Sequence, residues 1–402
     1  PRDGQSLSTL PEASPQLGDW LDNRYQIESV ISGGGTSIVY EAYDLERDKL
    51  CAVKVLRPEV ALVPSVVRHF FEEVVLTRPI RHPGVVPIRD VALSDQGWFY
   101  LVMERSHGMR LDKLMSDRGR LSYDEVIVLG RDLLRILAAV HAEGVVHLDL
   151  KPENVLIEST RLLLCDFGSA LRVGAAEAEG TPLYGTPEYM APEWILHREA
   201  TPAADLYALG VLMFEALYGD VPYRHDEPVD ILRDHVHEPF PLELLREVLP
   251  AAFRGRFQWF LSLLVEKDPD RRFGSAVEAL QMLEDQLVVR PEAVEDISIV
   301  RDDLEAEGWS CDVATDSADG GVAQRSSLDY GVQSDTGASA EEVVLAQIEL
   351  GGSDPLYVRE MLEDCVTTWK QALEDDGAQV VHDSGDVLRV LYAWGAGSKP
   401  AL

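Results

Sequence analysis

One eight-residue segment, followed by a tripeptide at a fixed distance, constrains this chain more than any other feature. The segment is His147-Leu148-Asp149-Leu150-Lys151-Pro152-Glu153-Asn154, and Asp166-Phe167-Gly168 follows, with Asp166 twelve residues after Asn154. Residues 162–165 between them are apolar and are expected to form a strand. Each piece alone would be read as a charged loop or as an ordinary Asp–Gly turn. Their combination at this spacing indicates an organised reaction site.

The polar groups of the two pieces match the needs of phosphoryl transfer from ATP. That reaction requires a carboxylate that orients the attacking hydroxyl, a cation near the transferred phosphate, and oxygen ligands that hold Mg²⁺. Asp149, Lys151, and the pair Asn154 and Asp166 supply these groups. The two pieces together resemble a protein-kinase active site. The resemblance implies that Asp149 and Lys151 are catalytic, that Asn154 and Asp166 are metal ligands, and that the cofactors are ATP and Mg²⁺ or Mn²⁺.

A glycine-rich turn lies upstream, in residues 25–43. The alternation of apolar and polar residues on both sides of the glycines predicts a strand, a turn and a second strand. Glycines allow backbone N–H groups to approach phosphates without interference from a Cβ atom. Aligned on Val39, the kinase pattern places Ser32, Gly34 and Ser37 at its three glycine positions, so only the middle glycine is kept. The residues expected to contact ATP here are Ile31, Ser32, Gly33, Gly34, Gly35 and Val39.

The single lysine of an apolar strand, Lys54, resembles the lysine that binds the α- and β-phosphates of ATP in kinases. Kinases pair this lysine with a glutamate of the helix called helix C. Glu73 follows Lys54 by nineteen residues in a stretch, residues 66–77, that is expected to be helical. Glu72 is the adjacent alternative. Counting back from Arg81-His82-Pro83, a familiar marker after helix C, favours Glu73.

A further apolar stretch, residues 99–104, is expected to be a buried strand that enters a turn at residues 106–108. By resemblance this is the hinge between the two lobes of a kinase, with Met103 as the gatekeeper. The adenine would then contact backbone groups of Glu104 and Ser106, and Val39 and Ala52 would pack on its face.

The segment Gly185-Thr186-Pro187-Glu188-Tyr189-Met190-Ala191-Pro192-Glu193 resembles the end of a kinase activation segment. By this resemblance Thr186 belongs to that segment, Thr181 is its most plausible phosphorylation site, and Glu193 pairs with Arg272 in a structural role. Asp205, also structural, opens a long apolar helix. Leu148 stands where most kinases have the arginine that binds a phosphorylated activation loop, so control by that phosphate is not expected.

The resemblance to bacterial Hanks-type serine/threonine kinases implies an α+β, bilobal fold. A first lobe with an antiparallel sheet and helix C is expected to precede a mainly helical second lobe. We expect a disordered leader over residues 1–24, a kinase domain over 25–288, an acidic linker over 289–340 and a small α/β module over 341–402. The leader is assigned from its Pro, Ser and Gly content, without a signal-peptide pattern.

Charge and composition limit the partners. The formal net charge is −34, and the residues from Val289 onward hold 24 acidic against 7 basic side chains. Such a field disfavours nucleic acid and anionic membranes. No apolar run approaches the roughly 20 residues of a membrane span. The four cysteines have no metal-ligand spacing, which fits a reduced cytoplasm.

After the linker, apolar patterning returns in the order strand, helix, strand, strand: residues 343–350, 357–375, 379–381 and 387–392. This order is similar to the start of class III nucleotidyl cyclase domains. In that family two aspartates hold two metal ions. Asp386 matches the second aspartate, but Gln347 occupies the first position. The resemblance therefore implies a partial, degenerate module without cyclase activity; an unrelated α/β unit is the alternative.

These observations predict an ATP- and Mg²⁺-dependent kinase that transfers the γ-phosphate to serine and threonine hydroxyls of proteins in bacterial signalling. The alternative is a pseudokinase scaffold that binds nucleotide without transferring phosphate. Lys54, Asp149, Asn154 and Asp166 are all retained, which favours the enzyme. A homodimer through the kinase domain or the C-terminal module is a further expectation.

Overall fold

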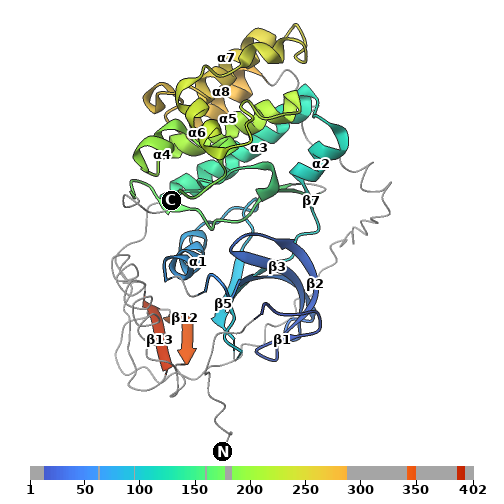
Figure 1. The fold of residues 1–402 in the computed structure, drawn as a ribbon, viewed down its shortest axis with the longest axis vertical. Coiled ribbons are helices and arrows are strands. Elements are labelled where there is room, and N and C mark those ends of the chain that lie inside the picture. The colour runs from blue at the N-terminus through green and yellow to red at the C-terminus, as the bar shows by residue number, and fades with distance from the viewer. Residues whose placement is uncertain are drawn as a thin grey trace, which may run out of the picture. The chain divides into compact units, whose positions relative to one another are not determined.

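The computed structural model describes residues 13–61, 64–94, 96–158, 161–176 and 183–287, together with two strands at 342–349 and 387–393. The chain divides into two compact units: Leu10–Arg301 form one, and Pro1–Thr9 with Asp302–Leu402 form the other. Among the described helices, none has the length and apolar content that crossing a membrane would require. The larger unit has two lobes, a sheet with one helix and a group of helices (Figure 1).

The first lobe is an antiparallel sheet in the order β1-β2-β3-β4-β6-β5, with one helix beside it. Apolar residues alternate with polar ones along β2 and β3, which is why both form strands with one buried face. The bounds are β1 Trp20–Leu21, β2 Tyr25–Gly33, β3 Ser37–Asp44, β4 Lys49–Leu56, α1 Pro64–Thr77, β5 Ile88–Leu93 and β6 Phe99–Glu104.

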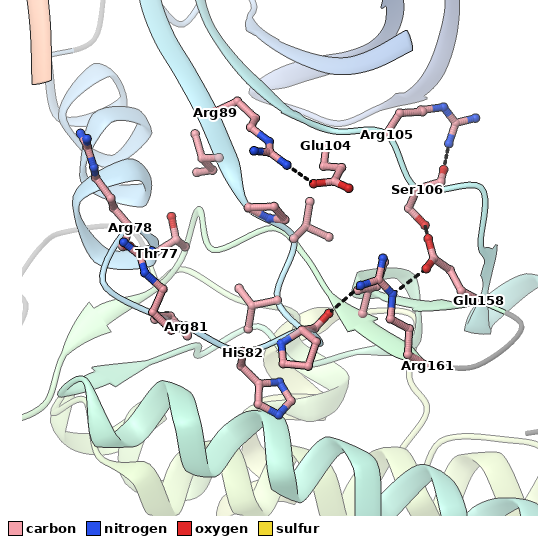
Figure 2. Close-up of a pocket in the computed structure, with 17 residues that line it drawn as sticks. Thr77, Arg78, Arg81, His82, Arg89, Glu104, Arg105, Ser106, Glu158 and Arg161 are labelled. Atoms are coloured by element: carbon pink, nitrogen blue, oxygen red, sulfur yellow. Dashed lines mark hydrogen bonds and ion pairs between the residues drawn. The ribbon is translucent and has the colours of Figure 1, made fainter. Parts of the chain in front are cut away.

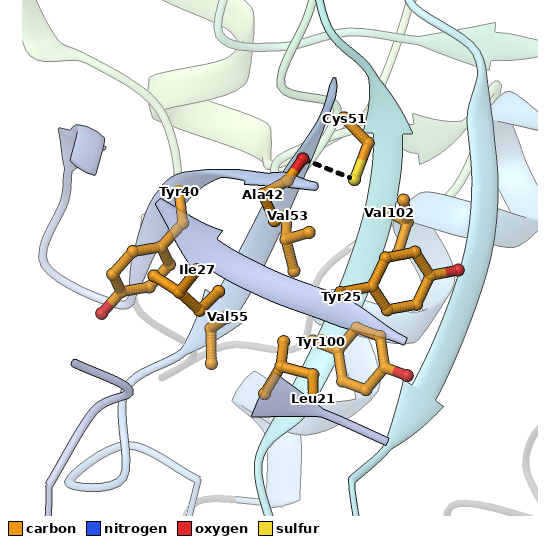
Figure 3. Close-up of a cluster of buried hydrophobic side chains, with 10 residues drawn as sticks. All are labelled: Leu21, Tyr25, Ile27, Tyr40, Ala42, Cys51, Val53, Val55, Tyr100 and Val102. Carbon is orange, nitrogen blue, oxygen red and sulfur yellow. Dashed lines mark hydrogen bonds between the residues drawn. The ribbon is translucent and has the colours of Figure 1, made fainter. Parts of the chain in front are cut away.

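The core of this lobe is a cluster contributed by β1, β2, β3, β4 and β6 (Figure 3). Tyr25 and Tyr100 meet edge to face with ring centroids 5.9 Å apart. The Cys51 thiol lies in the same cluster and donates a hydrogen bond to the Ala42 carbonyl over 3.3 Å. Burial raises the pKa of this thiol to about 12, so Cys51 is a packing residue and not a reactive one.

The expectation of a disordered leader is wrong for residues 13–24. Leu21 is fully buried in the cluster, and β1 pairs with β2. The Tyr40 hydroxyl donates to the Pro15 carbonyl over 3.0 Å, and Trp98 Nε1 donates to the Ala13 carbonyl over 2.9 Å. The Pro, Ser and Gly content suggested disorder, but one buried leucine and these donors hold the segment on the sheet.

The second lobe is mainly helical, as expected. Ser122 caps α3 together with Glu125 in a reciprocal capping box. Helix α5 is apolar all round and almost entirely buried, so it lies inside the lobe. The helices are α2 Leu111–Arg118, α3 Tyr123–Ala142, α4 Pro192–His197, α5 Pro202–Tyr218, α6 Pro228–His237, α7 Arg254–Leu264 and α8 Ala276–Gln286, with short 3₁₀ turns at Pro152–Asn154, Pro187–Tyr189, Leu242–Arg246 and Pro269–Arg271.

Short strands where the lobes meet position the predicted site. They are β7 Met109–Arg110, β8 Val145–Val146, β9 Val155–Ile157, β10 Leu162–Leu164 and β11 Leu171–Arg172. Strand β9 pairs with β10, with Val155 opposite Leu164. The Cys165 N–H donates to the Asn154 carbonyl over 3.0 Å. This hairpin therefore brings the end of the catalytic segment beside the start of Asp166-Phe167-Gly168.

In the second unit the structure describes only β12 Glu342–Glu349 and β13 Val387–Ala393, which pair antiparallel. Both were expected as strands, at residues 343–350 and 387–392. Gln347 stands opposite Arg389 in this register. The expected helix at 357–375, the strand at 379–381, Asp386 and the linker at 289–340 lie outside the described residues.

Candidate active site

Lys54 lies between two carboxylates. Its Nζ is 2.8 Å from Oε2 of Glu73 and 2.7 Å from Oδ1 of Asp166. Lys54 comes from β4 and Glu73 from α1, and both side chains are buried. The adjacent Glu72 lies instead near His69, with 3.6 Å between Oε2 and Nδ1. The structure therefore selects Glu73 over Glu72 as the partner of the strand lysine.

The charges of Lys54, Glu73 and Asp166 shift one another's pKa values. Burial alone would lower the pKa of Lys54, but the charges of Asp166 and Glu73 outweigh burial and raise it. The charge of Lys54 is also the main reason that the pKa of Asp166 falls to about 2. At neutral pH Lys54 is therefore a cation and Asp166 an anion, as phosphate and Mg²⁺ binding require.

Sequence reasoning missed why a glycine follows Phe167. A Cβ atom on Gly168 would lie 3.2 Å from Oδ1 of Asp166 and 3.4 Å from Nζ of Lys54. The absence of a side chain therefore leaves room for the lysine and its partners. Asp166 itself has φ +61°, and the Phe167 ring is buried against His147 with ring centroids 4.6 Å apart. This packing turns the Asp166 carboxylate toward Lys54.

Asp205 accepts two hydrogen bonds from the backbone of the catalytic segment. Its Oδ1 accepts from the Leu148 N–H and its Oδ2 from the His147 N–H, both over 2.9 Å. Nε2 of His141 lies 2.8 Å from the same Oδ2, and the Asp205 side chain is fully buried. Leu148 has φ +62°, a conformation that a leucine rarely adopts. The two backbone bonds stabilise it.

Asp149 lies in a network of four side chains. Its Oδ1 accepts from the Thr186 hydroxyl over 2.6 Å, and its Oδ2 is 2.8 Å from Nζ of Lys151. The same Nζ donates to the Thr186 hydroxyl over 2.7 Å. Nδ2 of Asn154 donates to the backbone carbonyl of Asp149 over 2.8 Å. The structure thus joins Thr186 of the activation segment to the predicted base and cation, a contact that linear spacing did not indicate.

The oxygen donors fit a metal that arrives with a nucleotide. Because Asn154 uses its amide N–H groups on Asp149, its Oδ1 remains the atom able to bind a cation. Asp166 adds a carboxylate whose side chain is about half exposed. Within the described ranges there is no cluster of three or more His, Cys, Asp or Glu residues that could hold a metal alone. Mg²⁺ is commonly bound by one or two protein oxygens together with phosphates.

The glycine-rich turn joins β2 to β3. The Gly34 N–H donates to the Ser37 carbonyl over 2.8 Å. None of Gly33, Gly34 and Gly35 has a positive φ, and a Cβ atom on Gly35 would meet nothing within 4 Å. The folded turn itself therefore does not need glycine at Gly35. The space beside Gly35 is open to a group that approaches the turn from outside.

The predicted hinge follows β6. Met103 is nearly buried and pairs with Ala52 across the sheet. The Glu104 N–H donates to the Pro87 carbonyl, just before β5, over 3.2 Å. Ser106 is buried, and its hydroxyl donates to Oε1 of Glu158 over 2.9 Å.

A separate cleft of about 490 Å³ borders the hinge residues Glu104, Arg105 and Ser106 (Figure 2). Neither Lys54 nor Asp166 lines it, so it is separate from the predicted nucleotide site. Two arginines that line the cleft form salt bridges: Arg89 with Glu104, and Arg161 with Glu158. We interpret this cleft as the space between the hinge and the loop that follows α1.

The activation segment is anchored at its far end. Nη1 and Nη2 of Arg272 lie 2.6 and 2.7 Å from the two carboxylate oxygens of Glu193, and both side chains are buried. Arg272 also donates to the Ala203 and Glu266 carbonyls, each over 2.7 Å. The predicted pair is thus present, far from the reacting groups. Thr181, the predicted phosphorylation site, lies outside the described residues.

Comparison with known proteins agrees with this geometry. Residues 25–287 match the family model of the protein kinase domain. Serine/threonine-protein kinase PknA of Mycobacterium tuberculosis is 34% identical over 268 residues, which are 65% of this chain and 61% of PknA. A probable serine/threonine-protein kinase of Clostridium perfringens is 30% identical over 271 residues, 67% of this chain and 39% of that protein.

A third relative, the probable serine/threonine-protein kinase PknB of Lactococcus lactis, is 33% identical over 229 residues, 56% of this chain and 36% of that protein. The matched region therefore spans less than two thirds of the length of each of these relatives. The family model, in contrast, covers more than half of this chain and includes Lys54, Glu73, Asp149, Asn154 and Asp166. On this evidence, together with the geometry of those residues, the chain belongs to the protein kinase domain family.

Proposed function

We propose that this chain is an ATP- and Mg²⁺-dependent kinase that transfers the γ-phosphate of ATP to serine and threonine hydroxyls of proteins. The observation that carries the proposal is the Lys54 contact with both Glu73 and Asp166. It places a cation beside the Asp166 carboxylate, while Asp149 and Lys151 are in contact at 2.8 Å. Mn²⁺ would serve in place of Mg²⁺ because the ligands are hard oxygens.

In this proposal each group has one task. Lys54 binds the α- and β-phosphates, and Asn154 and Asp166 would hold the metal against them. Asp149 orients the hydroxyl of the substrate, and Lys151 stabilises the negative charge of the transferred phosphoryl group. Thr186 now occupies Oδ1 of Asp149, so it marks the place that the substrate hydroxyl would take. The relatives named as serine/threonine-protein kinases support serine and threonine as acceptors.

Other predictions from the sequence keep that status. A nucleotide-binding scaffold without transfer gains no support, because the groups that transfer needs are all present and in contact. Four further points stay predictions: the partial cyclase-like module, dimerisation, the cytoplasmic location, and the domain bounds other than those of the leader.

The test is transfer of labelled phosphate from ATP and Mg²⁺ to a generic protein substrate by the full chain. We expect transfer by the wild type and a loss of at least about 10²-fold for Lys54→Met and Asp149→Asn, because positioning and general-base effects have this size. Lys49→Met, an exposed lysine of the same strand, and the exposed Asp117→Asn are matched controls. Transfer by either site variant at the rate of its control would refute the assigned roles.

A further inference from the structure

One ring contact joins α1 to the activation segment. The imidazole of His69 packs on the phenol ring of Tyr184, with ring centroids 4.6 Å apart and an angle of 42° between the planes. His69 lies on α1 four residues before Glu73, so both side chains lie on one face of the helix. Tyr184 directly precedes Gly185-Thr186 in the segment that reaches Asp149. The contact therefore connects the two sides of the site.

The Tyr184 side of this contact is fixed. Nε1 of Trp194, a fully buried residue of α4, donates to the Tyr184 carbonyl over 3.1 Å. The next residue, Gly185, has φ +110°, and a Cβ atom there would lie 2.9 Å from the Leu148 carbonyl. The backbone at Tyr184 is therefore pressed against the catalytic segment and anchored to the second lobe.

On the α1 side, two contacts join the helix to β6 and β4. Phe71 packs edge to face on Phe99 of β6, with ring centroids 5.7 Å apart, and Glu73 reaches Lys54. A rotation or an outward shift of α1 would break the Glu73–Lys54 bond, and a contact one helical turn earlier resists that movement. Leu148 has no charge with which to hold a phosphorylated segment in place. A ring contact needs no phosphate.

We propose that His69 and Tyr184 are positioning residues that hold α1 against the activation segment and so keep Glu73 on Lys54 without phosphorylation. The inference rests on the proposed kinase function. Aromatic pairs of this kind contribute enough to change a rate several-fold. The Tyr184 ring that His69 contacts belongs to the same chain, so this contact needs no added phosphate group.

The experiment uses the full chain with His69→Ala, Tyr184→Ala and the double variant. We expect each single variant to lower kcat about two- to tenfold, with a smaller change in the KM for the protein substrate. The kcat of the double variant should be no lower than the kcat of the less active single variant. His69→Phe and Tyr184→Phe keep a ring and should retain activity within about twofold of the wild type. Trp259→Ala, an exposed tryptophan of α7 that is 48% accessible, is the control. Multiplicative single effects, or alanine variants equal to this control, would overturn the proposal.

Amide hydrogen exchange separates this proposal from the kinase function, because it needs no transfer. Exchange in residues 66–77 should be faster in both alanine variants than in the wild type and in the phenylalanine variants, while α3 stays unchanged. If the wild type transferred no phosphate but α1 exchanged in this way, the kinase function would fail and the ring contact would stand. Unchanged exchange in the alanine variants would refute the contact itself.

Discussion

Replacing Asp205 with asparagine tests how the catalytic segment is held. The carboxylate is fully buried and accepts from the N–H groups of His147 and Leu148 and from His141. An amide has one oxygen, so at least one of these donors must face an NH₂ group. The best orientation keeps the oxygen toward His147 and His141 and leaves the Leu148 N–H without an acceptor.

The expected loss follows from these contacts. A hydrogen bond to a charged acceptor contributes about 1.5–3 kcal/mol, and bonds to a neutral acceptor are roughly half as strong. One bond lost and two weakened by half gives a loss of about 3–6 kcal/mol in the free energy of unfolding. Urea denaturation at pH 7 measures it, with Asp117→Asn as the exposed control. Phosphate transfer should also fall, because Leu148 with its φ of +62° loses its support next to Asp149.

The pH dependence of this loss is a second measurement. Burial alone would raise the pKa of Asp205, but the bonds and charges of His141 and His147 outweigh burial and lower it. A carboxylate with a lowered pKa stabilises the fold above the pKa of the unfolded chain, about 4, and this stability is lost as the pH falls through the folded value. The difference between wild type and Asp205→Asn should therefore shrink below about pH 4. A difference under about 1 kcal/mol at pH 7, or one that grows in acid, would refute this account of Asp205.

Three further predictions concern the same lobes. Ser32→Gly should lower the KM for ATP more than it raises kcat, because a side chain is removed from the phosphate turn; an equal or higher KM would count against this. Gly185→Ala should destabilise the fold and reduce transfer by at least about tenfold, since it combines a φ of +110° with a contact of 2.9 Å to the Leu148 carbonyl; melting temperature and transfer rate measure both. Thr181→Ala and phosphatase-treated enzyme should keep activity within about tenfold of untreated protein on an external substrate, or roughly 1.4 kcal/mol of barrier; a larger loss would show that another cation replaces the arginine missing at Leu148.

What the sequence predicted well is local. The Asp149-to-Asn154 segment, the strand that carries Lys54 and the helix that carries Glu73 are contiguous patterns, and each lies where the pattern placed it. The choice between Glu72 and Glu73 rested on spacing alone, and the side chains settled it. Periodicity sufficed for these elements because each one buries its own apolar face.

What the sequence could not predict depends on contacts between distant segments. Asp205 follows Leu148 by 57 residues and was expected to open a helix and to be structural, but its partners were not predicted: it accepts hydrogen bonds from the backbone of His147 and Leu148. The contact between Thr186 and Asp149, and the ring contact between His69 and Tyr184, likewise join segments that no local pattern links. Composition misjudged residues 13–24, because the burial of Leu21 and the hydrogen bonds from Tyr40 and Trp98 to this segment are contacts with distant residues.

The two-residue strand β1 is one of the two edge strands of the sheet. It pairs with β2 at one edge, and the main-chain groups of an uncovered edge strand are a template for pairing with another molecule. A chain shortened to begin at Tyr25, the first residue of the kinase match, would uncover the two β2 residues that β1 pairs with and remove Leu21, whose burial contributes about 1.5–3 kcal/mol. Such a shortened domain would retain every group of the active site and yet tend to self-associate, so its solubility, and not its chemistry, would be the property most affected by the cut.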